Sequence, residues 1–157
     1  MKRLLKISSV LAVLVGVVVV VAGFWGLVFT YQNIAREKIV TTEDASIPNA
    51  AVRDPLTLKA QADVIRKHTL KATKDKTYAE MPQQVAKVDA SGSAVLDKDG
   101  KPVMVPNAAR NIWVTATTLT TSLNFGIMAY MVSGLAILFG LVLIWSGIVA
   151  GALSKKY

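Results

Sequence analysis

One short stretch of the chain, QADVIRKHTL at residues 61–70, gathers the side chains best suited to chemistry. It holds His68, the only histidine of the chain, near Asp63 and Arg66. A histidine beside a carboxylate suits general acid–base catalysis, and an imidazole is also a common metal ligand. The stretch therefore raises two alternatives, a reaction centre or a side chain that only packs.

The helix expected to carry this stretch decides between the two alternatives. Asp54 and Pro55 fit the N-cap and first positions of a helix over residues 55–72. At 100° per residue, His68 shares a face with Gln61, away from most of the charges. We expect His68 to pack. The opposite, basic face would be a solvated surface, or else it would contact anionic lipid headgroups or an acidic partner. The candidate contact residues are Lys59, Arg66, Lys67 and Lys71.

The rest of the sequence supplies no partners for a catalytic or metal centre. A ring-opening iron site needs two histidines and a carboxylate, and thiolate sites need cysteine, of which the chain has none. The DKDG segment lacks the further acids of a calcium loop. We predict no catalytic, metal or cofactor-binding residues and no cofactor. Non-covalent haem with His68 as its ligand stays an open alternative.

Two long uncharged segments define the class of the protein. Residues 7–35 and 111–154 contain no charged side chain, and about 18 apolar residues suffice to span a bilayer. We predict transmembrane helix 1 over residues 7–30. A second helix is predicted over residues 113–152, with its transmembrane span at about 125–147.

The direction of the spans follows from the charges at the tips. The tips at residues 1–6 and 153–157 are short and basic, which predicts that both are cytoplasmic in a bacterial plasma membrane. The segment 31–112 would then be extracytoplasmic. A cleaved signal peptide ending at Ala22 is the alternative, but the apolar run continues beyond it. Three aromatic residues are expected at the membrane interfaces: Trp25, Tyr31 and Trp145.

Charge also argues against nucleic acid as a partner. The chain carries a net charge of +8, but five of its basic residues lie at the two tips. The middle holds 13 basic and 10 acidic residues, so no strongly basic surface remains there for a polyanion. We predict membrane lipid as a partner and no nucleic acid.

Small residues on both spans predict close helix packing. Pairs of small residues four apart let helix backbones approach closely in lipid. The two spans would pack on each other, or else against a second copy or another membrane protein. An apolar seam from Ile112 to Ile127 predicts that the two helices continue together as a stalk beyond the bilayer. The candidate helix-packing residues are Ala12, Gly16, Gly23, Ala129, Ser133, Gly147 and Gly151.

The external segment completes the predicted fold. AVL and VMV around DKDG predict a short β-hairpin over residues 94–105. Thr77 and Glu80 have the spacing of a capping box. The expected fold is mainly α: an antiparallel hairpin of two transmembrane helices that extends beyond the bilayer, with one amphipathic helix and a short β-hairpin outside.

Two segments of the chain carry a family resemblance. VRDPLTLKAQADVIRKHTLKATKDKTYAEMP and NAARNIWVTATTLTTSLNFGIMAY resemble small bacterial two-span membrane proteins of unknown function. Some members of that family are labelled aromatic ring-opening dioxygenases. The resemblance implies two spans and an external segment, and it provides no catalytic residues.

These observations favour a non-enzymatic integral membrane protein that acts as an accessory, scaffold or assembly subunit of a membrane protein complex. Its partner would be another membrane protein or a second copy. A homo-oligomeric membrane assembly or pore is the alternative, and a metal-dependent ring-opening dioxygenase ranks below both.

Overall fold

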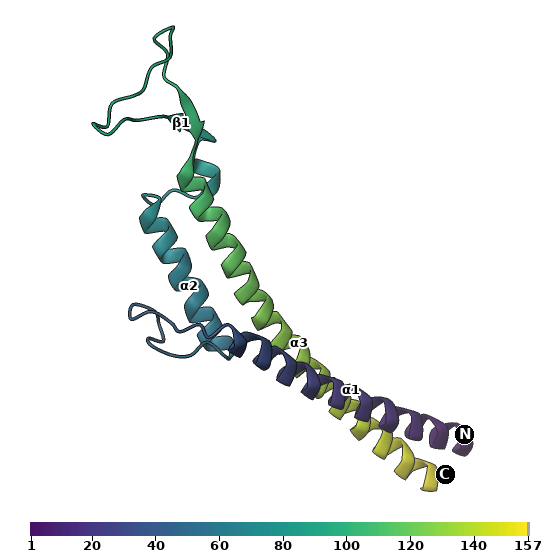
Figure 1. Ribbon diagram of the computed structural model, residues 1–157. Helices are drawn as coiled ribbons and strands as arrows, with labels where there is room; N and C mark the ends of the chain where they lie inside the picture. The colour runs from purple at the N-terminus through teal and green to yellow at the C-terminus, as the bar shows by residue number, and fades with distance from the viewer. Residues whose placement is uncertain (157) are drawn as a thin grey trace.

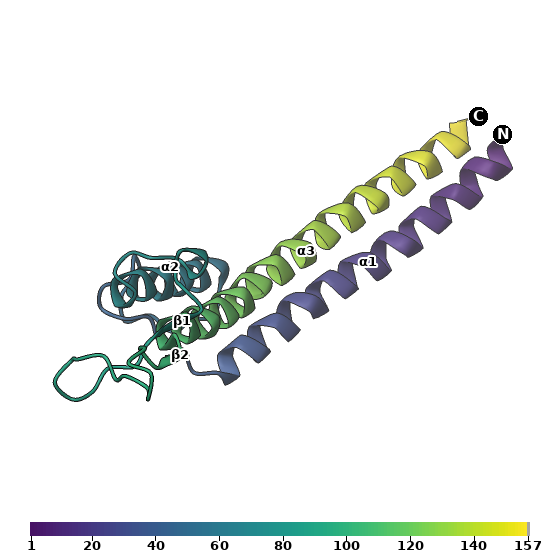
Figure 2. The ribbon, with the colours of Figure 1, turned by 90° about the horizontal axis from the view of Figure 1, so that it is seen from above.

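The computed structural model describes residues 1–156, and the chain is mainly helical with one small sheet. α1 and α3 run side by side with both termini at one end, and α2 lies along the other half of α3 (Figures 1 and 2). The prediction of a mainly α fold with two long apolar helices and two short strands is confirmed. The elements are α1 (Lys2–Arg36), α2 (Pro55–Ala72), the 3-10 helix η1 (Tyr78–Glu80), β1 (Gln84–Ala86), β2 (Met104–Pro106) and α3 (Ala108–Lys156).

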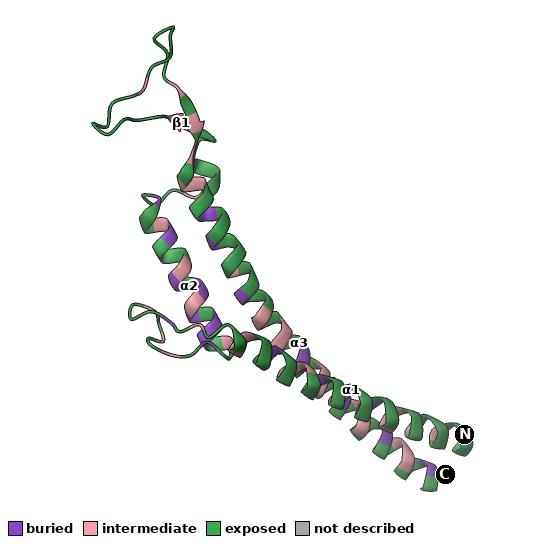
Figure 3. Cartoon of the chain, viewed as in Figure 1, coloured by how far each residue is buried: buried purple, intermediate pink, exposed green. Residues whose placement is uncertain are grey.

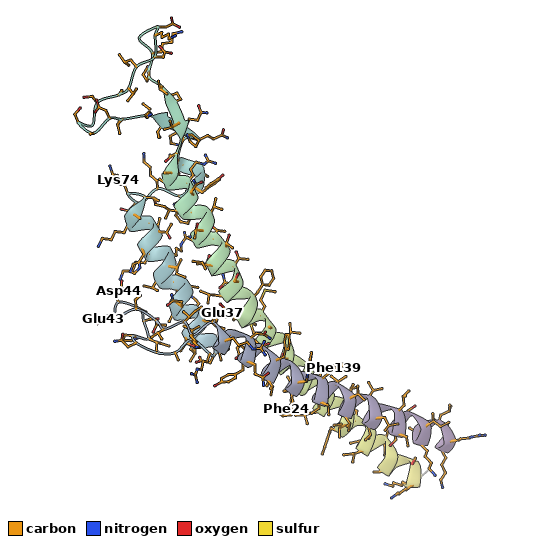
Figure 4. The ribbon with its side chains drawn as sticks, viewed as in Figure 1. Phe24, Glu37, Glu43, Asp44, Lys74 and Phe139 are labelled. Carbon is orange, nitrogen blue, oxygen red and sulfur yellow. The ribbon has the colours of Figure 1, made fainter. Side chains whose placement is uncertain are left out.

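α1 and α3 are long and apolar enough to cross a membrane. Only 11% of the most apolar window of each helix is buried within the protein. The core helix of a soluble domain would bury most of such a window. Figure 3 shows exposed residues along the outer faces of both helices, and Phe24 and Phe139 project away from the helix pair (Figure 4).

Small residues set the distance between α1 and α3. A Cβ atom built on Gly16 would lie 2.7 Å from the carbonyl oxygen of Gly140, and a Cβ atom on Gly140 would lie 2.7 Å from that of Gly16. Ser9 Oγ donates a hydrogen bond of 2.7 Å to the carbonyl oxygen of Gly147. The small residues recur every seventh position on both helices: Ser9, Gly16, Gly23 and Thr30 on α1, and Gly126, Ser133, Gly140, Gly147 and Ser154 on α3.

The predicted packing residues are partly correct. Four of them are buried between the two helices: Gly16, Gly23, Ser133 and Gly147. Gly151 lies against Ser9, whereas Ala12 and Ala129 are only half-buried beside the contact. The expected four-residue spacing is wrong for the interface as a whole, because antiparallel helices in continuous contact repeat every seven residues. That spacing also omitted Gly140, which lies at the centre.

The stalk consists of α2 and α3, not of α1 and α3. The predicted seam of Ile112, Ala116, Leu119, Leu123 and Ile127 is partly correct: Ala116 and Leu123 are buried, whereas Ile112 and Leu119 are 43% and 49% exposed. Trp113 is buried in place of its neighbour Ile112. α1 ends at Arg36, so it cannot accompany this half of α3. A separate helix, α2, supplies the apolar face that buries the seam.

α2 begins where the sequence predicts. Asp54 accepts hydrogen bonds from the backbone amides of Leu56 and Thr57, and Pro55 stands at the first turn. Thr57 Oγ1 in turn accepts a hydrogen bond from the backbone amide of Asp54, the N-cap residue. These bonds satisfy amides that a helix start leaves without partners, so they fix the first residue of α2.

The hydrophobic core lies at the junction of all three α-helices. Val52, Leu58, Ala62 and Leu123 form its buried centre. Partly buried side chains surround it: Ile34, Ile39, Ile65, Ile127 and Tyr130. The Tyr130 hydroxyl donates to the carbonyl oxygen of Arg53, which ties the start of α2 to the middle of α3. The junction therefore joins the helix pair to the segment predicted above to lie outside the membrane, which we continue to call the external segment.

The far end of the molecule carries two turns of similar structure. In each, an aspartate carboxylate accepts backbone amides two and four residues ahead: Asp89 from Ser91 and Ser93, and Asp97 from Asp99 and Lys101. Gly92 and Gly100 adopt positive φ angles of 84° and 75°, which favour glycine.

Three strand-like segments meet at the base of these turns. The amide of Lys87 donates to the carbonyl of Val103, that of Val103 to Val95, and that of Val95 to Lys87. β1 pairs with β2 in antiparallel register, with Val85 opposite Val105. The turn predicted at DKDG is present, and Leu96 pairs with Pro102. The predicted hairpin over 94–105 is therefore present around its turn, but Met104 and Val105 belong to β2 and form a ladder with the earlier segment β1.

Candidate functional site

The strongest cluster of polar side chains joins α2 to the loop that precedes it. Asp44 Oδ2 lies 2.8 Å from Lys67 Nζ and 2.9 Å from His68 Nε2. Thr42 Oγ1 donates to the other carboxylate oxygen at 2.9 Å. Asp44 projects from the loop toward α2 in Figure 4. The carboxylate thus holds residues 37–54 against the helix.

This cluster overturns the prediction that His68 is a packing residue. Half of the His68 side chain is exposed, and its ring contacts the Asp44 carboxylate. His68 and Gln61 do share a face of α2, as the helical periodicity predicts. The periodicity of α2 cannot show that the loop containing Asp44 lies against that face. Within residues 1–156 no three side chains of histidine, cysteine, aspartate or glutamate gather as a metal site. The geometry is that of a tether.

The same contacts make the tether sensitive to acid. Hydrogen bonds from Lys67, and then from His68 and Thr42, lower the pKa of Asp44 well below its ordinary value of 3.8. A carboxylate with a depressed folded pKa stabilises the fold above its unfolded pKa, and that contribution is lost as pH falls below it.

We therefore expect Asp44→Asn to speed amide hydrogen exchange in residues 42–50 at neutral pH, because a neutral amide binds the Lys67 ammonium and the His68 ring less strongly than a carboxylate does. In the unsubstituted chain the same exchange should accelerate only below about pH 4, after correction for intrinsic exchange rates. Glu43→Gln is the matched control, because Glu43 lies in the same loop and makes no ion pair among residues 1–156. Equal exchange in both variants would contradict the assignment.

The predicted basic face of α2 is divided by the structure. Lys67 is bound by Asp44, and Lys71 is exposed on the helix surface. Lys59 pairs with Asp63, while Arg66 stacks over Trp113 with its guanidinium carbon 5.8 Å from the ring centroid. The four candidate contact residues therefore do not form one surface.

Lys59 and Arg66 face α3 across a recess that we call the polar groove. It has a volume of about 380 Å³. Its polar lining comes from one face of each helix: Lys59, Asp63 and Arg66 of α2, and Thr117, Thr120 and Asn124 of α3. Trp113, Ala62 and Ala116 form its floor. Asn124 lies at the end of the groove nearest to α1.

The opposite side of α2 and α3 forms a second recess, which we call the apolar groove. Its two parts, of about 490 and 580 Å³, share Ile65 and Leu119. One part extends past Ile112 toward the start of α3, and the other reaches Ile34 at the end of α1. The two grooves thus give α2 and α3 one charged side and one apolar side.

The three predicted interfacial aromatics occupy different environments. Trp25 and Trp145 are 66% and 68% exposed on the outside of the helix pair, as a lipid-facing residue would be. Trp25 also stacks on Phe29. Tyr31 is partly exposed and its hydroxyl accepts a hydrogen bond from Arg53 Nη1. Tyr31 therefore also helps to attach the external segment.

Trp113 was not predicted to be important, although it anchors the far end of α2. Its ring is buried, and its indole N–H lies 2.8 Å from the carbonyl oxygen of Lys76 and 3.1 Å from Thr73 Oγ1. The available signal was a tryptophan in an otherwise Thr-rich segment, one position from the assumed seam.

No family model, curated protein or solved structure matches this chain. The resemblance to small bacterial two-span membrane proteins therefore stays a prediction.

Proposed function

We propose that this chain is a non-enzymatic membrane protein of the bacterial plasma membrane. α1 and α3 would cross the bilayer, both basic tips would be cytoplasmic, and α2 with the tip would stand outside. In this role it serves as an accessory, scaffold or assembly subunit that presents its stalk to another membrane protein. The length, apolar surface and low burial of α1 and α3 support the membrane placement.

One observation carries the docking role: the face of α3 that holds α1 continues beyond the end of α1. Leu119 and Ile112 lie seven and fourteen residues before Gly126, so they continue the face of α3 that contacts α1. These two side chains line the apolar groove and are about half exposed. Three packed helices would complete a bundle here, but this chain supplies only α2 and α3. An apolar helix of the partner fits the vacant position.

A second feature of the groove supports a partner with a hydrogen-bond donor. Gln61 lines the groove near Leu58, and its Oε1 atom is buried without a hydrogen bond within residues 1–156. Buried polar atoms are nearly always satisfied in folded proteins. If the Gln61 side chain turns toward the groove, a donor on the docked helix, such as a serine or asparagine side chain, would satisfy it.

The test uses the tagged full-length chain purified from its native membranes in mild detergent. Leu119→Glu places a charge in the groove and should reduce partner recovery at least tenfold, since a buried unpaired charge costs several kcal/mol. Val114→Glu is the control, because Val114 is similarly exposed but lies outside the groove. Circular dichroism checks that both variants remain helical.

Two outcomes would count against the proposal. A chain that purifies alone as a monomer has no stable partner. Equal loss of partner recovery in Leu119→Glu and Val114→Glu would show that the partner does not bind in the apolar groove. Native mass spectrometry distinguishes a second copy from a different protein in the recovered complex. A second copy would favour the homo-oligomeric alternative. A pore would need several copies, because the backbones of α1 and α3 are in close contact.

A further inference from the structure

The polar groove combines two cations with one carboxylate. Lys59, Asp63 and Arg66 follow one another at four and three positions along α2, so they share a face. The carboxylate of Asp63 neutralises one cation through its ion pair with Lys59. Arg66 makes no ion pair among residues 1–156 and is held over the Trp113 ring. The groove therefore keeps one positive charge.

The opposite wall adds neutral hydrogen-bonding groups. The Thr120 hydroxyl donates to the carbonyl oxygens of Ala116 and Thr117, so its own oxygen remains an acceptor. Thr117 and Asn124 present a hydroxyl and an amide, each of which can donate and accept. This wall suits a ligand with hydroxyl groups beside its charge.

The groove lies close to the level at which α1 ends. In the register of the helix pair, Asn124 is opposite Gln32, within one turn of Arg36. If α1 and α3 cross the bilayer as proposed above, the Asn124 end of the groove lies at the height of the outer lipid headgroups. The groove then extends outward along α3 for about 16 Å, at ~1.5 Å per residue, to Trp113 and Arg66. The inference rests on that membrane placement, but it needs no protein partner.

We propose that the polar groove binds the headgroup of an anionic phospholipid through its phosphodiester. A phosphodiester carries a single negative charge, which matches the one positive charge left in the groove. The Arg66 guanidinium offers paired donors that fit two phosphate oxygens. A glycerol headgroup would place its hydroxyls against Thr117, Thr120 and Asn124. The ligand class is therefore a phosphatidylglycerol-like lipid.

The test titrates the full-length chain in neutral detergent with short-chain phosphatidylglycerol, and Trp113 fluorescence is the readout. Trp25→Phe and Trp145→Phe remove the two other tryptophans, which lie outside the groove. Arg66→Gln and Lys59→Gln should each weaken binding about fivefold or more, since one basic group near a membrane surface contributes about 1 kcal/mol. Arg66→Lys should give an intermediate affinity, because it keeps the positive charge but loses the paired donors of the guanidinium.

A matched control and an opposite substitution make the test specific. Lys71→Gln removes an exposed lysine of the same helix outside the groove and should leave the affinity unchanged. Asp63→Asn should tighten binding several-fold, because it removes the competing carboxylate. Equal losses in Lys71→Gln and Arg66→Gln would overturn the site, because binding would then depend only on overall charge.

Two further probes identify the source of the phosphate. Short-chain phosphatidylcholine has the same phosphodiester but no net charge, so it should bind more weakly than phosphatidylglycerol. Inorganic phosphate should not compete at concentrations comparable to the lipid. Competition at equal concentration would overturn the lipid assignment. Loss of partner recovery and loss of lipid binding are measured separately, so failure of either proposal can be distinguished from failure of the other.

Discussion

Gly140→Val should separate α1 from α3. The first side-chain carbon at this position would lie 2.7 Å from the Gly16 carbonyl oxygen and 2.9 Å from the Val20 backbone nitrogen. Backbone atoms cannot move aside without moving the whole helix, and overpacking of a rigid contact costs about 1–3 kcal/mol or more. In lipid no hydrophobic force between the helices opposes this separation. The expected result is a pair of helices that remain helical but no longer pack.

Engineered cysteines measure this separation cleanly, because the chain has no cysteine of its own. A Cβ atom on Gly151 would lie 3.6 Å from the Cβ atom of Ser9, within the range that a disulfide requires. Ser9→Cys with Gly151→Cys should cross-link readily, and adding Gly140→Val should slow cross-linking about tenfold, as a cost of about 1.4 kcal/mol implies.

Gly134→Val provides the matched control for this experiment. Gly134 lies on the same helix, but a Cβ atom there would meet no atom within 4 Å. Cross-linking should therefore proceed at the original rate. If Gly140→Val and Gly134→Val cross-linked equally fast, the close packing of the two backbones would be refuted.

Trp113→Ala should release the far end of α2 from α3. The substitution empties a buried site and removes the donor to the Lys76 carbonyl oxygen and Thr73 Oγ1. Replacing a buried tryptophan by alanine costs about 3–5 kcal/mol. The external segment has a small core, so a loss of this size should unfold its outer half while α1 and α3 stay paired.

Limited trypsin digestion of the full-length chain in detergent reports this release. Cleavage at Lys74 and Lys76, in the turn that follows α2, should become at least tenfold faster in Trp113→Ala. Trp113→Phe should give an intermediate rate, because it keeps most of the ring and loses only the N–H donor. Trp145→Ala is the control, since Trp145 is 68% exposed. An unchanged cleavage rate in Trp113→Ala would show that the ring does not anchor α2.

Local signals in the sequence predicted the starts of elements well. Asp54 and Pro55 mark the first turn of α2, and the Thr77 and Glu80 side chains cap η1 as their spacing predicts. α3 is the exception: it begins at Ala108, five residues before the predicted start at 113, where Asn107 Oδ1 accepts the amide of Ala109. These contacts involve residues within four positions of one another, so a single sequence carries the whole signal.

Contacts between distant segments were predicted less well. His68 meets Asp44 from 24 residues away, and Trp113 meets Thr73 from 40 residues away. A helical wheel shows which residues share a face, but not which loop covers that face. The seam on α3 was only partly predicted for a related reason. The helix that packs on this half of α3 is α2, not α1, and it approaches from a side that buries Trp113 and leaves Ile112 and Leu119 exposed.

The repeat at the tip could have been recognised from spacing. Asp89 and Asp97 are eight residues apart, and so are Gly92 and Gly100, each three residues after its aspartate. Only the second turn was predicted, because DKDG is a familiar turn sequence and DASG, at residues 89–92, is not. The closure of Lys87, Val95 and Val103 into one hydrogen-bonded ring follows from this eight-residue repeat, since it returns the chain to the same point twice.

Because small residues recur every seven positions on both α1 and α3, these residues alone do not determine how far one helix is shifted along the other. Sliding α1 along α3 by one heptad, about 10.5 Å, would place Gly16 opposite Ser133 or Gly147, and small residues would again face one another. The small residues of α1 and α3 therefore permit several equivalent axial positions of one helix relative to the other. Contacts at the junction of the three helices select one of these positions: the Tyr130 hydroxyl donates to the carbonyl oxygen of Arg53, and the core packs around Leu58. The contacts of the external segment thus fix the axial position of α1 relative to α3.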